Sequence, residues 1–498
     1  MTDTTTHAPT DVTYDALFVG GEWTAPATDR RIEVVSPSTG RPVGAVPEAT
    51  EADGDRAVAA ARAAFDDPAG WSTWAPEDRR DAIERLAVAL EARGPEMARR
   101  VSMQNGMPIS ISTALEAGFP PLLLRYYADM VVSTPAEQVR PGLLGGRTLV
   151  LHEPIGVVAA IVPWNFPQAI AMLKLAPLLA AGCTVVLKPS PETVLDAFLL
   201  AEAVEEAGLP AGVVNVVPGG RELGAHLVAH PGVDKVSFTG STAAGRSIGE
   251  VCGRLLRPCT LELGGKSAAI VLEDADLAGN LEALFGVTLI NNGQTCWLNS
   301  RILAPRSQYG DVLDILGGLA GGVTIGDALD PATQIGPMTS ARQRERVESY
   351  IATGRAEGGR VVVGGGRPEG LDDGFFVQPT VFADLDNTAR IAREEIFGPV
   401  LTVIPYDTVD EAIAIANDSD YGLGGTVWTT DPERGEAVAR RVQSGTIGIN
   451  AYANDPTAPF GGMKASGLGR ELGPEGLGAY RSVRSIYLDA SAGAEASA

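Results

Sequence analysis

One cysteine stands where the sequence predicts a sharp turn. Cys296 follows the segment 291–295 (NNGQT), in which Gly293 falls at the predicted end of a helix. A thiol on such a turn can be presented as a nucleophile. A free cysteine is also commonly a small buried hydrophobic residue, so Cys296 taken alone leaves both interpretations open.

A thiol nucleophile needs a base, and no histidine lies near Cys296 in the sequence. Glu262 is a candidate general base, because it falls within the apolar strand predicted at 260–263 and is followed by Gly264 and Gly265. A single glutamate at the end of a strand is usually a solvated side chain. Two glycines beside it favour a site, since they let backbone or ligand approach closely.

A polar amide between two aromatic residues follows the first predicted strand. Asn165 lies between Trp164 and Phe166, where the chain leaves the sheet. A preorganised amide donor stabilises an oxyanion by about 3 kcal/mol. Asparagine also forms turns and caps helices, and the pattern by itself leaves the two interpretations equally open.

A glycine-rich turn joins a predicted strand to a predicted helix at 238–245 (FTGSTAAG). Free backbone N–H groups and the positive end of a helix dipole can hold a pyrophosphate there. The spacing from Gly240 to Gly245 is GxxxxG and not the GxGxxG of ordinary dinucleotide folds. The turn therefore predicts an anion site and nothing more specific.

Lysine is rare in this chain, and arginine supplies most of the positive charge. The lysines are Lys174, Lys188, Lys235, Lys266 and Lys464. A retained lysine suggests a need for a compact ammonium that a planar guanidinium cannot replace. Lys188, at the end of the predicted strand 184–188, is suited to contact a ribose or a phosphate.

Alternating strands and helices are predicted to position these residues in an α/β fold. Val/Ile-rich strands at 157–163, 184–188, 213–217, 235–239 and 260–263 alternate with helices at 169–181, 193–207 and 242–255. This βαβ series indicates a doubly wound parallel sheet of the nucleotide-binding type.

A second α/β domain is predicted after this series. Its helices are expected at 277–291, 341–357, 409–417 and 432–442, and its strands at 361–363, 400–405 and 425–428. Residues 131–153 and 483–488 are predicted to be strands of neither series. Such arms often complete the sheet of a neighbouring subunit.

Composition excludes several classes of partner. With 39 Lys and Arg against 62 Asp and Glu, the net charge of −23 argues against nucleic acid and anionic membranes as partners. No apolar stretch reaches the ~18 residues of a membrane span, and residues 1–13 do not resemble a signal peptide, so we expect a cytoplasmic protein. The four cysteines and four histidines are scattered without metal-binding spacing, so we expect neither a metal nor a disulfide.

The motifs occur together in an order that resembles the aldehyde dehydrogenase superfamily over residues 15–490. The matching segments are PWNFP (163–167), LKP (187–189), FTGST (238–242), LELGGK (261–266), GQTC (293–296), EEIFGP (394–399) and PFGG (459–462). The resemblance implies a Rossmann-type cofactor domain at 14–130 and 154–262 and an α/β catalytic domain at 263–460. It also implies a small β oligomerisation arm at 131–153 and 461–490, with disordered tails at 1–13 and 491–498.

The same resemblance implies NAD(P)-dependent oxidation of an aldehyde to a carboxylic acid. Cys296 would attack the aldehyde, and Asn165 with the Cys296 backbone N–H would hold the oxyanion. Glu262 would activate the water that hydrolyses the thioester, with Lys174 and Glu471 behind it as a proton relay. A homo-oligomer, dimer or tetramer, is expected.

Cofactor contacts are also implied by resemblance. Lys188 and Glu395 would hold the two riboses, Phe397 would lie beside the nicotinamide, and Gly240, Ser241 and Gly245 would contact the pyrophosphate. The remaining expected contacts are Ile161, Pro163, Trp164, Ser190, Pro191, Phe238 and Leu263. Many NAD-selective relatives carry a glutamate where this chain has Pro191, and Glu192 is expected to point elsewhere. NAD is expected, and NADP stays open.

The implied substrate tunnel is mostly apolar, which favours a medium-sized hydrophobic aldehyde. Its expected lining is Phe166, Ile170, Leu173, Ile290, Trp297, Asp455 and Phe460. Asp455 stands where many relatives have an aromatic residue, and it is either a polar end of the tunnel or an outward-turned loop residue.

Three rival functions are weighed against this one. A CoA-acylating relative would typically lack the glutamate found at position 262. A non-catalytic nucleotide-binding protein would not need Asn165, Glu262 and Cys296 together. A thiol hydrolase would need a histidine partner for Cys296, and none is plausible.

Overall fold

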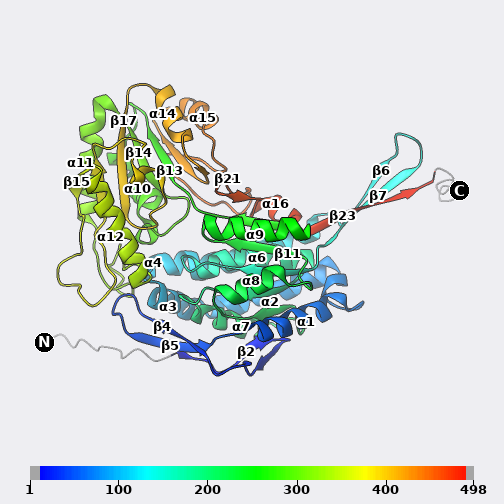
Figure 1. Ribbon diagram of the computed structural model, residues 1–498. Coiled ribbons are helices and arrows are strands. Elements are labelled where there is room, and N and C mark those ends of the chain that lie inside the picture. The colour runs from blue at the N-terminus through cyan, green and yellow to red at the C-terminus, as the bar shows by residue number, and fades with distance from the viewer. Residues whose placement is uncertain (1–11, 490–498) are drawn as a thin grey trace.

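Two open sheets form the body of the molecule, and a third, narrow sheet projects from it (Figure 1). The computed structural model describes residues 12–489. The tails that we expected to be disordered therefore lie outside the described residues, except for Val12 and Thr13. These two residues form β1 (Val12–Thr13), which pairs with β5 (Pro42–Pro47), so the predicted N-terminal tail was too long.

The first sheet is the doubly wound sheet that the sequence predicts. Its strands, in spatial order, are β22 (Gly467–Leu468), β12 (Cys259–Glu262), β11 (Lys235–Thr239), β8 (Val157–Ile161), β9 (Thr184–Lys188), β10 (Val214–Val216), β2 (Leu17–Val19) and β3 (Glu22–Thr24). The five central strands are parallel. The winding direction reverses between β8 and β11, and ligands of such folds bind beyond the carboxyl ends of the strands at this point.

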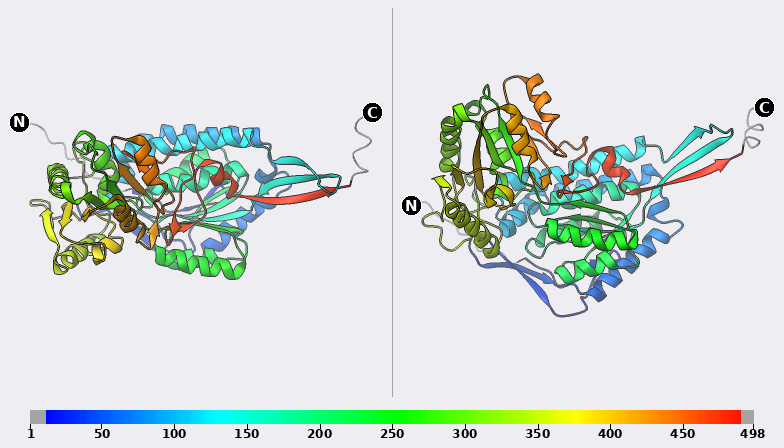
Figure 2. Two further views of the ribbon diagram at one scale, coloured as in Figure 1. Left: turned by 90° about the horizontal axis from the view of Figure 1, so that it is seen from above. Right: turned by 45° about the horizontal axis from the view of Figure 1, so that its top comes forward.

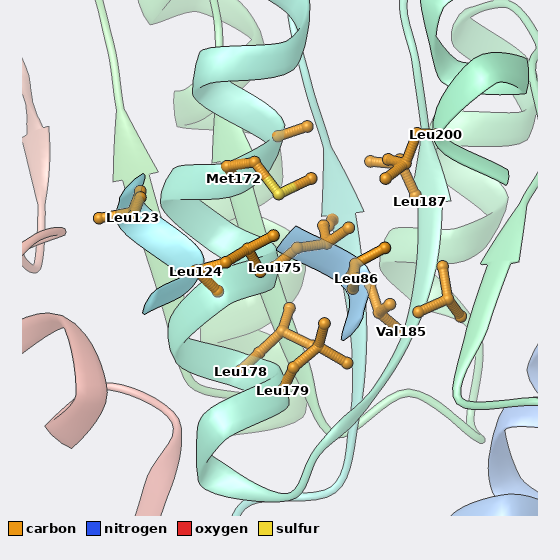
Figure 3. Close-up of a cluster of buried hydrophobic side chains, with 14 of the residues drawn as sticks. Leu86, Leu123, Leu124, Met172, Leu175, Leu178, Leu179, Val185, Leu187 and Leu200 are labelled. Carbon is orange, nitrogen blue, oxygen red and sulfur yellow. The ribbon is translucent and has the colours of Figure 1, made fainter. Parts of the chain in front are cut away.

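Helices cover both faces of this sheet because its central strands are apolar on both sides. Val158 and Ala160 of β8 pack toward one face and Val157 and Ala159 toward the other. Figure 3 shows part of the first face, where Leu175 and Leu179 meet Val185. The helices of that face are α2 (Pro76–Ala92), α5 (Phe119–Ser133), α6 (Pro167–Ala181) and α7 (Leu195–Glu206), and those of the other are α1 (Glu51–Asp66), α8 (Arg221–Ala229) and α9 (Thr242–Leu255).

The second sheet belongs to the second predicted α/β series. Its strands, in spatial order, are β15 (Arg360–Val363), β16 (Thr380–Ala383), β17 (Val400–Tyr406), β14 (Asn299–Pro305), β13 (Ser267–Val271), β19 (Gly425–Trp428) and β20 (Gly448–Ile449). Only β15 pairs antiparallel in this sheet. The helices packed around it are α10 (Leu281–Thr288), α11 (Tyr309–Gly322), α12 (Ala341–Ala356), α14 (Val409–Asn417) and α15 (Pro432–Ala439).

The third sheet is an arm that extends away from the body in every view (Figures 1 and 2). It consists of β6 (Glu137–Pro141), β7 (Arg147–Pro154) and β23 (Arg481–Leu488), all antiparallel. The segments predicted for it were too long. Residues 131–133 still belong to α5, and within 461–480 β22 pairs with β12 while α16 (Gly473–Gly478) packs against α6.

Most predicted elements between 155 and 450 occur within a few residues of their expected positions, and the strands at 184–188, 235–239 and 425–428 match. The helix predicted at 277–291 is wrong in one respect, because α10 ends at Thr288 and the chain then turns. Smaller elements complete the chain: β4 (Arg31–Val35), α3 (Gly94–Asn105), α4 (Ile109–Ile111), the π-helical segment η2 (Ser112–Gly118), α13 (Arg390–Arg393), β18 (Tyr421–Gly422) and β21 (Met463–Lys464).

Candidate active site

Cys296 follows three successive residues in the left-handed backbone region. Asn291, Asn292 and Gly293 have φ of 51°, 60° and 76°. Such conformations are unfavourable for residues other than glycine and persist only where the surroundings enforce them. Asn292 is enforced by three hydrogen bonds, since its Nδ2 donates to the carbonyls of Gly106 and Pro337 and its Oδ1 accepts from the Gly336 N–H.

Asn165 is tied to this turn by reciprocal hydrogen bonds. Its Nδ2 donates to the carbonyl oxygen of Gln294 at 3.0 Å, and Asn291 Nδ2 donates to the carbonyl oxygen of Asn165 at 2.9 Å. One Nδ2 hydrogen is therefore used to orient the amide, and the second is left for another acceptor. The turn before Cys296 and the predicted oxyanion donor Asn165 are thus hydrogen-bonded to each other, although they are far apart in the sequence.

Glu262 lies at the end of β12 and is almost wholly buried, with 3% of its surface exposed. Neither carboxylate oxygen has a hydrogen-bond partner within residues 12–489. Burial, and then the nearby Glu471, raise the pKa of Glu262 well above its ordinary value. The backbone approaches closely here, since a Cβ on Gly461 would lie 2.6 Å from Glu262 Oε1 and one on Gly265 would lie 2.3 Å from the Cys296 carbonyl oxygen.

Lys174 and Glu471 form a buried ion pair behind Glu262. Lys174 Nζ lies 2.6 Å from Glu471 Oε1 and donates to Thr239 Oγ1 at 2.7 Å. The second carboxylate oxygen of Glu471 has no partner in the described part of the chain. Glu471 lines the same cavity as Glu262, so the predicted relay residues do come together.

Cys296 lies where two cavities meet. A cavity of about 420 Å³ and a second of about 410 Å³ share three lining residues, Asn165, Thr239 and Cys296. Burial, followed by the negative charges of Glu395 and Glu262, raises the pKa of the Cys296 thiol above its ordinary value. Formation of the thiolate therefore needs a base or a compensating positive charge.

The first cavity is mostly apolar and contains six of the seven predicted tunnel residues: Phe166, Ile170, Leu173, Ile290, Trp297 and Phe460. Asp455 is not part of its wall. That side chain is exposed and accepts two hydrogen bonds from Thr457, both of 2.8 Å, so it is the outward-turned loop residue of the two alternatives.

Sequence reasoning missed several residues of this wall: Leu115, Phe119, Ala283, Gly286, Val287, Tyr452 and Asn454. Tyr452 stacks on Trp297 with ring centroids 4.5 Å apart. Helical spacing could have indicated part of the set, because Leu115 and Phe119 are four residues apart, as are Ala283 and Val287. Nothing local in the sequence associates these stretches with each other.

The second cavity lies beyond the carboxyl ends of β8, β11 and β12, and seven predicted cofactor residues line it: Pro163, Trp164, Gly240, Ser241, Leu263, Glu395 and Phe397. Arg342, Gln343 and Arg346 also line it and were missed, because α12 is distant in sequence from every motif. The other predicted contacts, Ile161, Lys188, Ser190, Pro191, Phe238 and Gly245, are not on its wall.

These six residues support the cavity or lie beside it. Gly245 packs under Leu263, where a Cβ would lie 2.3 Å from the Leu263 side chain, and Phe238 packs under Gly240. Ile161 is buried in the core. Lys188 is buried, which lowers its pKa to about 8, and its Nζ donates to the carbonyls of Pro189 and Gly219 at 2.8 Å.

Glu192 contacts a residue of the second cavity but is not on the cavity wall itself. Ser190 Oγ donates to Glu192 Oε2 at 2.6 Å, and Glu192 Oε1 lies 3.2 Å from the guanidinium of Arg342, a residue of the second cavity. Pro191 is half-buried between them. The Glu192 carboxylate therefore lies beside Arg342, one position later in the sequence than the glutamate of the family pattern.

Groups that can hold a dinucleotide surround the second cavity. The fourteen-residue helix α9 begins at Thr242 after Gly240, with Ser241 as its cap. Its positive end and unpaired N–H groups suit a pyrophosphate. Phe397, held at φ of 64°, meets Trp164 edge-on at 5.2 Å. Glu395 accepts from the Gly265 N–H at 2.9 Å, and burial raises its pKa to about 6.

The histidines are less scattered than the sequence suggests. His226 Nε2 and His230 Nε2 lie 2.6 and 3.3 Å from Asp55 Oδ1, and these three ligand types lie within 4.8 Å of one another. The Gly232 N–H donates to His230 Nδ1, so a neutral His230 carries its proton on Nε2, facing Asp55. That proton is directed at Asp55 Oδ1, 3.3 Å from the nitrogen. We interpret the cluster as a set of hydrogen bonds that links α1 to the C-terminal end of α8.

Comparisons with known proteins agree with this geometry. The family model described as the aldehyde dehydrogenase family matches residues 23–486. Geranial dehydrogenase of Castellaniella defragrans is 56% identical over 96% of this chain and 99% of its own. A Mycobacterium tuberculosis aldehyde dehydrogenase crystallised with NAD+ has a TM-score of 0.94 and 50% identity, over 96% of this chain and 99% of that one.

A third similar protein was crystallised with an aldehyde. It is a variant of aldehyde dehydrogenase C of Pseudomonas syringae in complex with NAD+ and octanal, with a TM-score of 0.91 and 41% identity, over 95% of this chain and 96% of that one. No helix among residues 12–489 is long and apolar enough to cross a membrane.

Proposed function

This chain belongs to the aldehyde dehydrogenase family, and we propose that it oxidises a hydrophobic aldehyde to the carboxylic acid with NAD+. The observation that carries the proposal is the position of Cys296, at the junction of an apolar cavity with a cavity suited to a dinucleotide. We propose that the first sheet with its helices binds the cofactor and that the second α/β unit carries the nucleophile.

The cofactor fits the residues that are present. Arg342, Arg346 and the first turn of α9 supply donors for the pyrophosphate, and Glu395 supplies an acceptor for a ribose hydroxyl. NAD+, when bound, supplies the hydride acceptor that no side chain can provide. Similar aldehyde dehydrogenases were crystallised with NAD+, which supports NAD as the cofactor.

Carbon–sulfur bond formation is the first step. The Cys296 thiol first releases its proton to solvent in the cavity. The resulting thiolate attacks the aldehyde carbon, and the carbonyl oxygen becomes an oxyanion. The free Nδ2 hydrogen of Asn165 and the Cys296 backbone N–H donate to that oxyanion, which is the charge that develops in this step. After loss of hydride from the carbon, Cys296 carries the acyl group as a thioester.

Hydrolysis of the thioester restores the thiol. Glu262 removes a proton from water, the water oxygen adds to the acyl carbon, and the carbon–sulfur bond breaks to release the carboxylic acid. The raised pKa of Glu262 makes it a stronger base than an exposed glutamate. Glu471, paired with Lys174, lies on the same cavity and would pass the proton onward.

The substrate class is supported by the wall of the first cavity and by a relative. Its volume of about 420 Å³ and its aromatic and aliphatic lining suit an aldehyde of roughly eight to ten carbons. The relative that is 56% identical is named for geranial. We propose terpenoid-like or medium-chain aldehydes as substrates, and a homo-oligomer assembled through the arm as the working form.

The decisive assay follows reduced nicotinamide as the protein is mixed with geranial, octanal or propanal and either NAD+ or NADP+, with and without CoA. We expect turnover with NAD+ that needs no CoA and is most efficient with the longer aldehydes. Turnover that depends on CoA would show that the acyl group is transferred to CoA and not to water. Absence of turnover with every aldehyde, despite bound NAD+, would refute the enzymatic function.

A further inference from the structure

A buried carboxyl outside the reaction scheme contacts the element that carries Asn165. Glu116 is 1% exposed and lies in the π-helical segment η2 (Ser112–Gly118), between α4 and α5. π-Helical turns inside α-helices are rare and occur frequently at functional sites. Leu115 and Phe119, on either side of Glu116 in sequence, line the apolar cavity, so η2 separates that cavity from the Glu116 carboxyl.

Glu116 caps α6 from another part of the chain. Its Oε2 accepts from the Gln168 N–H at 2.7 Å and from the Ala169 N–H at 3.4 Å. These are first-turn donors of α6, for which the N-cap residue Phe166 provides no side-chain acceptor in the described structure. A helix whose first donors are buried needs such an acceptor, and the residue before Phe166 is Asn165.

The contact is one part of a buried network under the Asn165 loop. Gln168 Nε2 donates to Asp196 Oδ2 at 2.6 Å, and Gln104 Nε2 donates to the other oxygen of Asp196. Gln104 Oε1 in turn accepts from the N–H groups of Val194 and Leu195, where α7 begins. The network therefore holds the starts of α6 and α7 against each other.

The loop formed by Trp164 and Asn165 is held by hydrogen bonds to its backbone carbonyls. Asn105 Nδ2 donates to the Trp164 carbonyl and, at 3.4 Å, to the Asn165 carbonyl, and Thr193 Oγ1 donates to the Trp164 carbonyl at 3.3 Å. The backbone of Trp164 and Asn165 is thus held on one side by Asn105 and Thr193, and on the other by the start of α6. Glu116 holds the backbone at the start of α6, and Asp196 holds the same turn through the Gln168 side chain.

We propose that Glu116 is a positioning residue: through the first turn of α6 it holds the loop that carries Asn165, so that the Asn165 amide is preorganised toward the oxyanion. The inference rests on the proposed function. Misplacement of a preorganised donor by a fraction of an ångström is enough to weaken an oxyanion hole.

A neutral side chain at position 116 can accept the same hydrogen bonds from the first turn of α6. Burial raises the pKa of Glu116 to about 8 and that of its neighbour Asp196 to about 6, so at neutral pH Glu116 carries a proton. Glutamine has nearly the same shape and retains a carbonyl oxygen that can accept from Gln168 and Ala169. Alanine has no acceptor. Glu116→Gln removes only the ionisable group, whereas Glu116→Ala also removes the hydrogen-bond acceptor. Comparison of the two variants therefore shows which of these features matters.

The test is a double-mutant cycle with Asn165→Ala, measured as kcat/KM for octanal. We expect Glu116→Ala to lower kcat/KM by about 10- to 100-fold with NAD+ affinity nearly unchanged, and Glu116→Gln to stay within about threefold of wild type. In the Asn165→Ala background, Glu116→Ala should cost less than about twofold, because the group it positions is gone. Independent losses that multiply in the double variant would overturn the proposal, as would an unchanged kcat/KM in Glu116→Ala.

Two further measurements distinguish a positioning role of Glu116 from a general loss of stability. They also distinguish failure of this inference from failure of the proposed function. Thr408→Ala removes a comparable cap, the acceptor for the Glu411 N–H at the start of α14, and should lower stability without changing kcat/KM. Hydrogen exchange needs no turnover: the amides of Gln168 and Ala169 should exchange faster in Glu116→Ala than in wild type. Unchanged exchange there would refute the capping role even if no aldehyde were oxidised.

Discussion

At the scale of single residues, the proposed reaction depends on the Cys296 thiol, which burial makes a weaker acid, and on the Glu262 carboxylate, which burial makes a stronger base. Both shifts have the same origin, because a low dielectric disfavours the charged form of each group. The raised pKa of Glu262 suits it to take a proton from water in the hydrolysis step. Three predictions concern single side chains.

Cys296→Ala should abolish aldehyde oxidation, since no other group at the junction of the cavities can form the thioester. NAD+ binding, measured by isothermal titration calorimetry, should persist because the second cavity is otherwise intact. Cys259→Ala is the matched control, since Cys259 is a half-buried free cysteine outside the site, and it should retain turnover. Residual steady-state activity in Cys296→Ala would contradict the assigned nucleophile.

Glu262→Gln should permit one burst of reduced cofactor and little turnover, because acylation proceeds but the water lacks its base. In wild type the deacylation rate should rise with pH, since the base must be ionised, and its midpoint should lie well above pH 4.5 because the pKa of Glu262 is raised. Rapid-quench and stopped-flow measurements distinguish the two phases. A burst-free variant with normal turnover would assign the base elsewhere.

Glu116→Gln should change how stability depends on pH. The folded-state pKa of about 8 exceeds the ordinary value of 4.5, so the folded state binds this proton more tightly. The stability that this group contributes is fully present below the unfolded pKa and is lost as pH rises through about 8, at no more than about 1.4 kcal/mol per pH unit. Relative to wild type, the variant should gain on the order of 1–3 kcal/mol between about pH 6 and pH 9 in urea unfolding. An equal pH dependence in both proteins would contradict the raised pKa.

At the scale of elements, one short helix sets the width of the apolar cavity. Ala283, Gly286 and Val287 of α10 contribute to its wall. A Cβ built on Gly286 meets nothing within 4 Å, so the glycine leaves open space toward the substrate. The absence of a side chain here is a feature of packing that periodicity in the sequence does not reveal.

Gly286→Leu should therefore shift the preference toward short aldehydes. The added side chain fills part of the cavity, so the ratio of kcat/KM for octanal to that for propanal should fall by roughly 10-fold or more. Gly318→Leu, at another helical glycine with open space around it, is the control and should leave the ratio unchanged. An unchanged ratio in Gly286→Leu would mean that the substrate does not pass α10.

At the scale of the whole molecule, the arm exposes apolar side chains of a kind that monomeric proteins usually keep buried. Val139 on β6, and Val483 and Tyr487 on β23, are 57%, 62% and 83% exposed. Exposed apolar strands of this kind mark contacts with other chains. The arm is therefore the surface through which we expect copies of this chain to associate.

Val483→Asp with Tyr487→Asp should weaken this association, because each carboxylate would have to be desolvated in the interface. Light scattering after size-exclusion chromatography should show a smaller particle than wild type at equal concentration. Leu329→Asp, at a partly exposed leucine of the second α/β unit, should leave the mass unchanged. A double variant of unchanged mass would place the interface elsewhere.

The sequence by itself determined the α/β class, the order of strands and helices from 155 to 272, and the identities of Cys296, Glu262 and Asn165 as candidates. These features are local: apolar runs, helix-ending glycines and motif residues act within a few positions of each other. The sequence also placed Gly240 and Ser241 correctly at the start of α9. It left the position of Asp455 open and was wrong about the extent of the arm, because both depend on how the chain packs in three dimensions.

Only the tertiary structure decided which of these residues meet. The turn that presents Cys296 is held in a left-handed conformation by contacts with residues 106 and 336–337, and Asn165 reaches it across 129 positions of sequence. The acceptor that caps α6, Glu116, comes from a π-helical segment some fifty residues earlier. Such contacts arise from burial and from the need to satisfy buried polar groups, which are properties of the folded chain as a whole and leave no local pattern in the sequence.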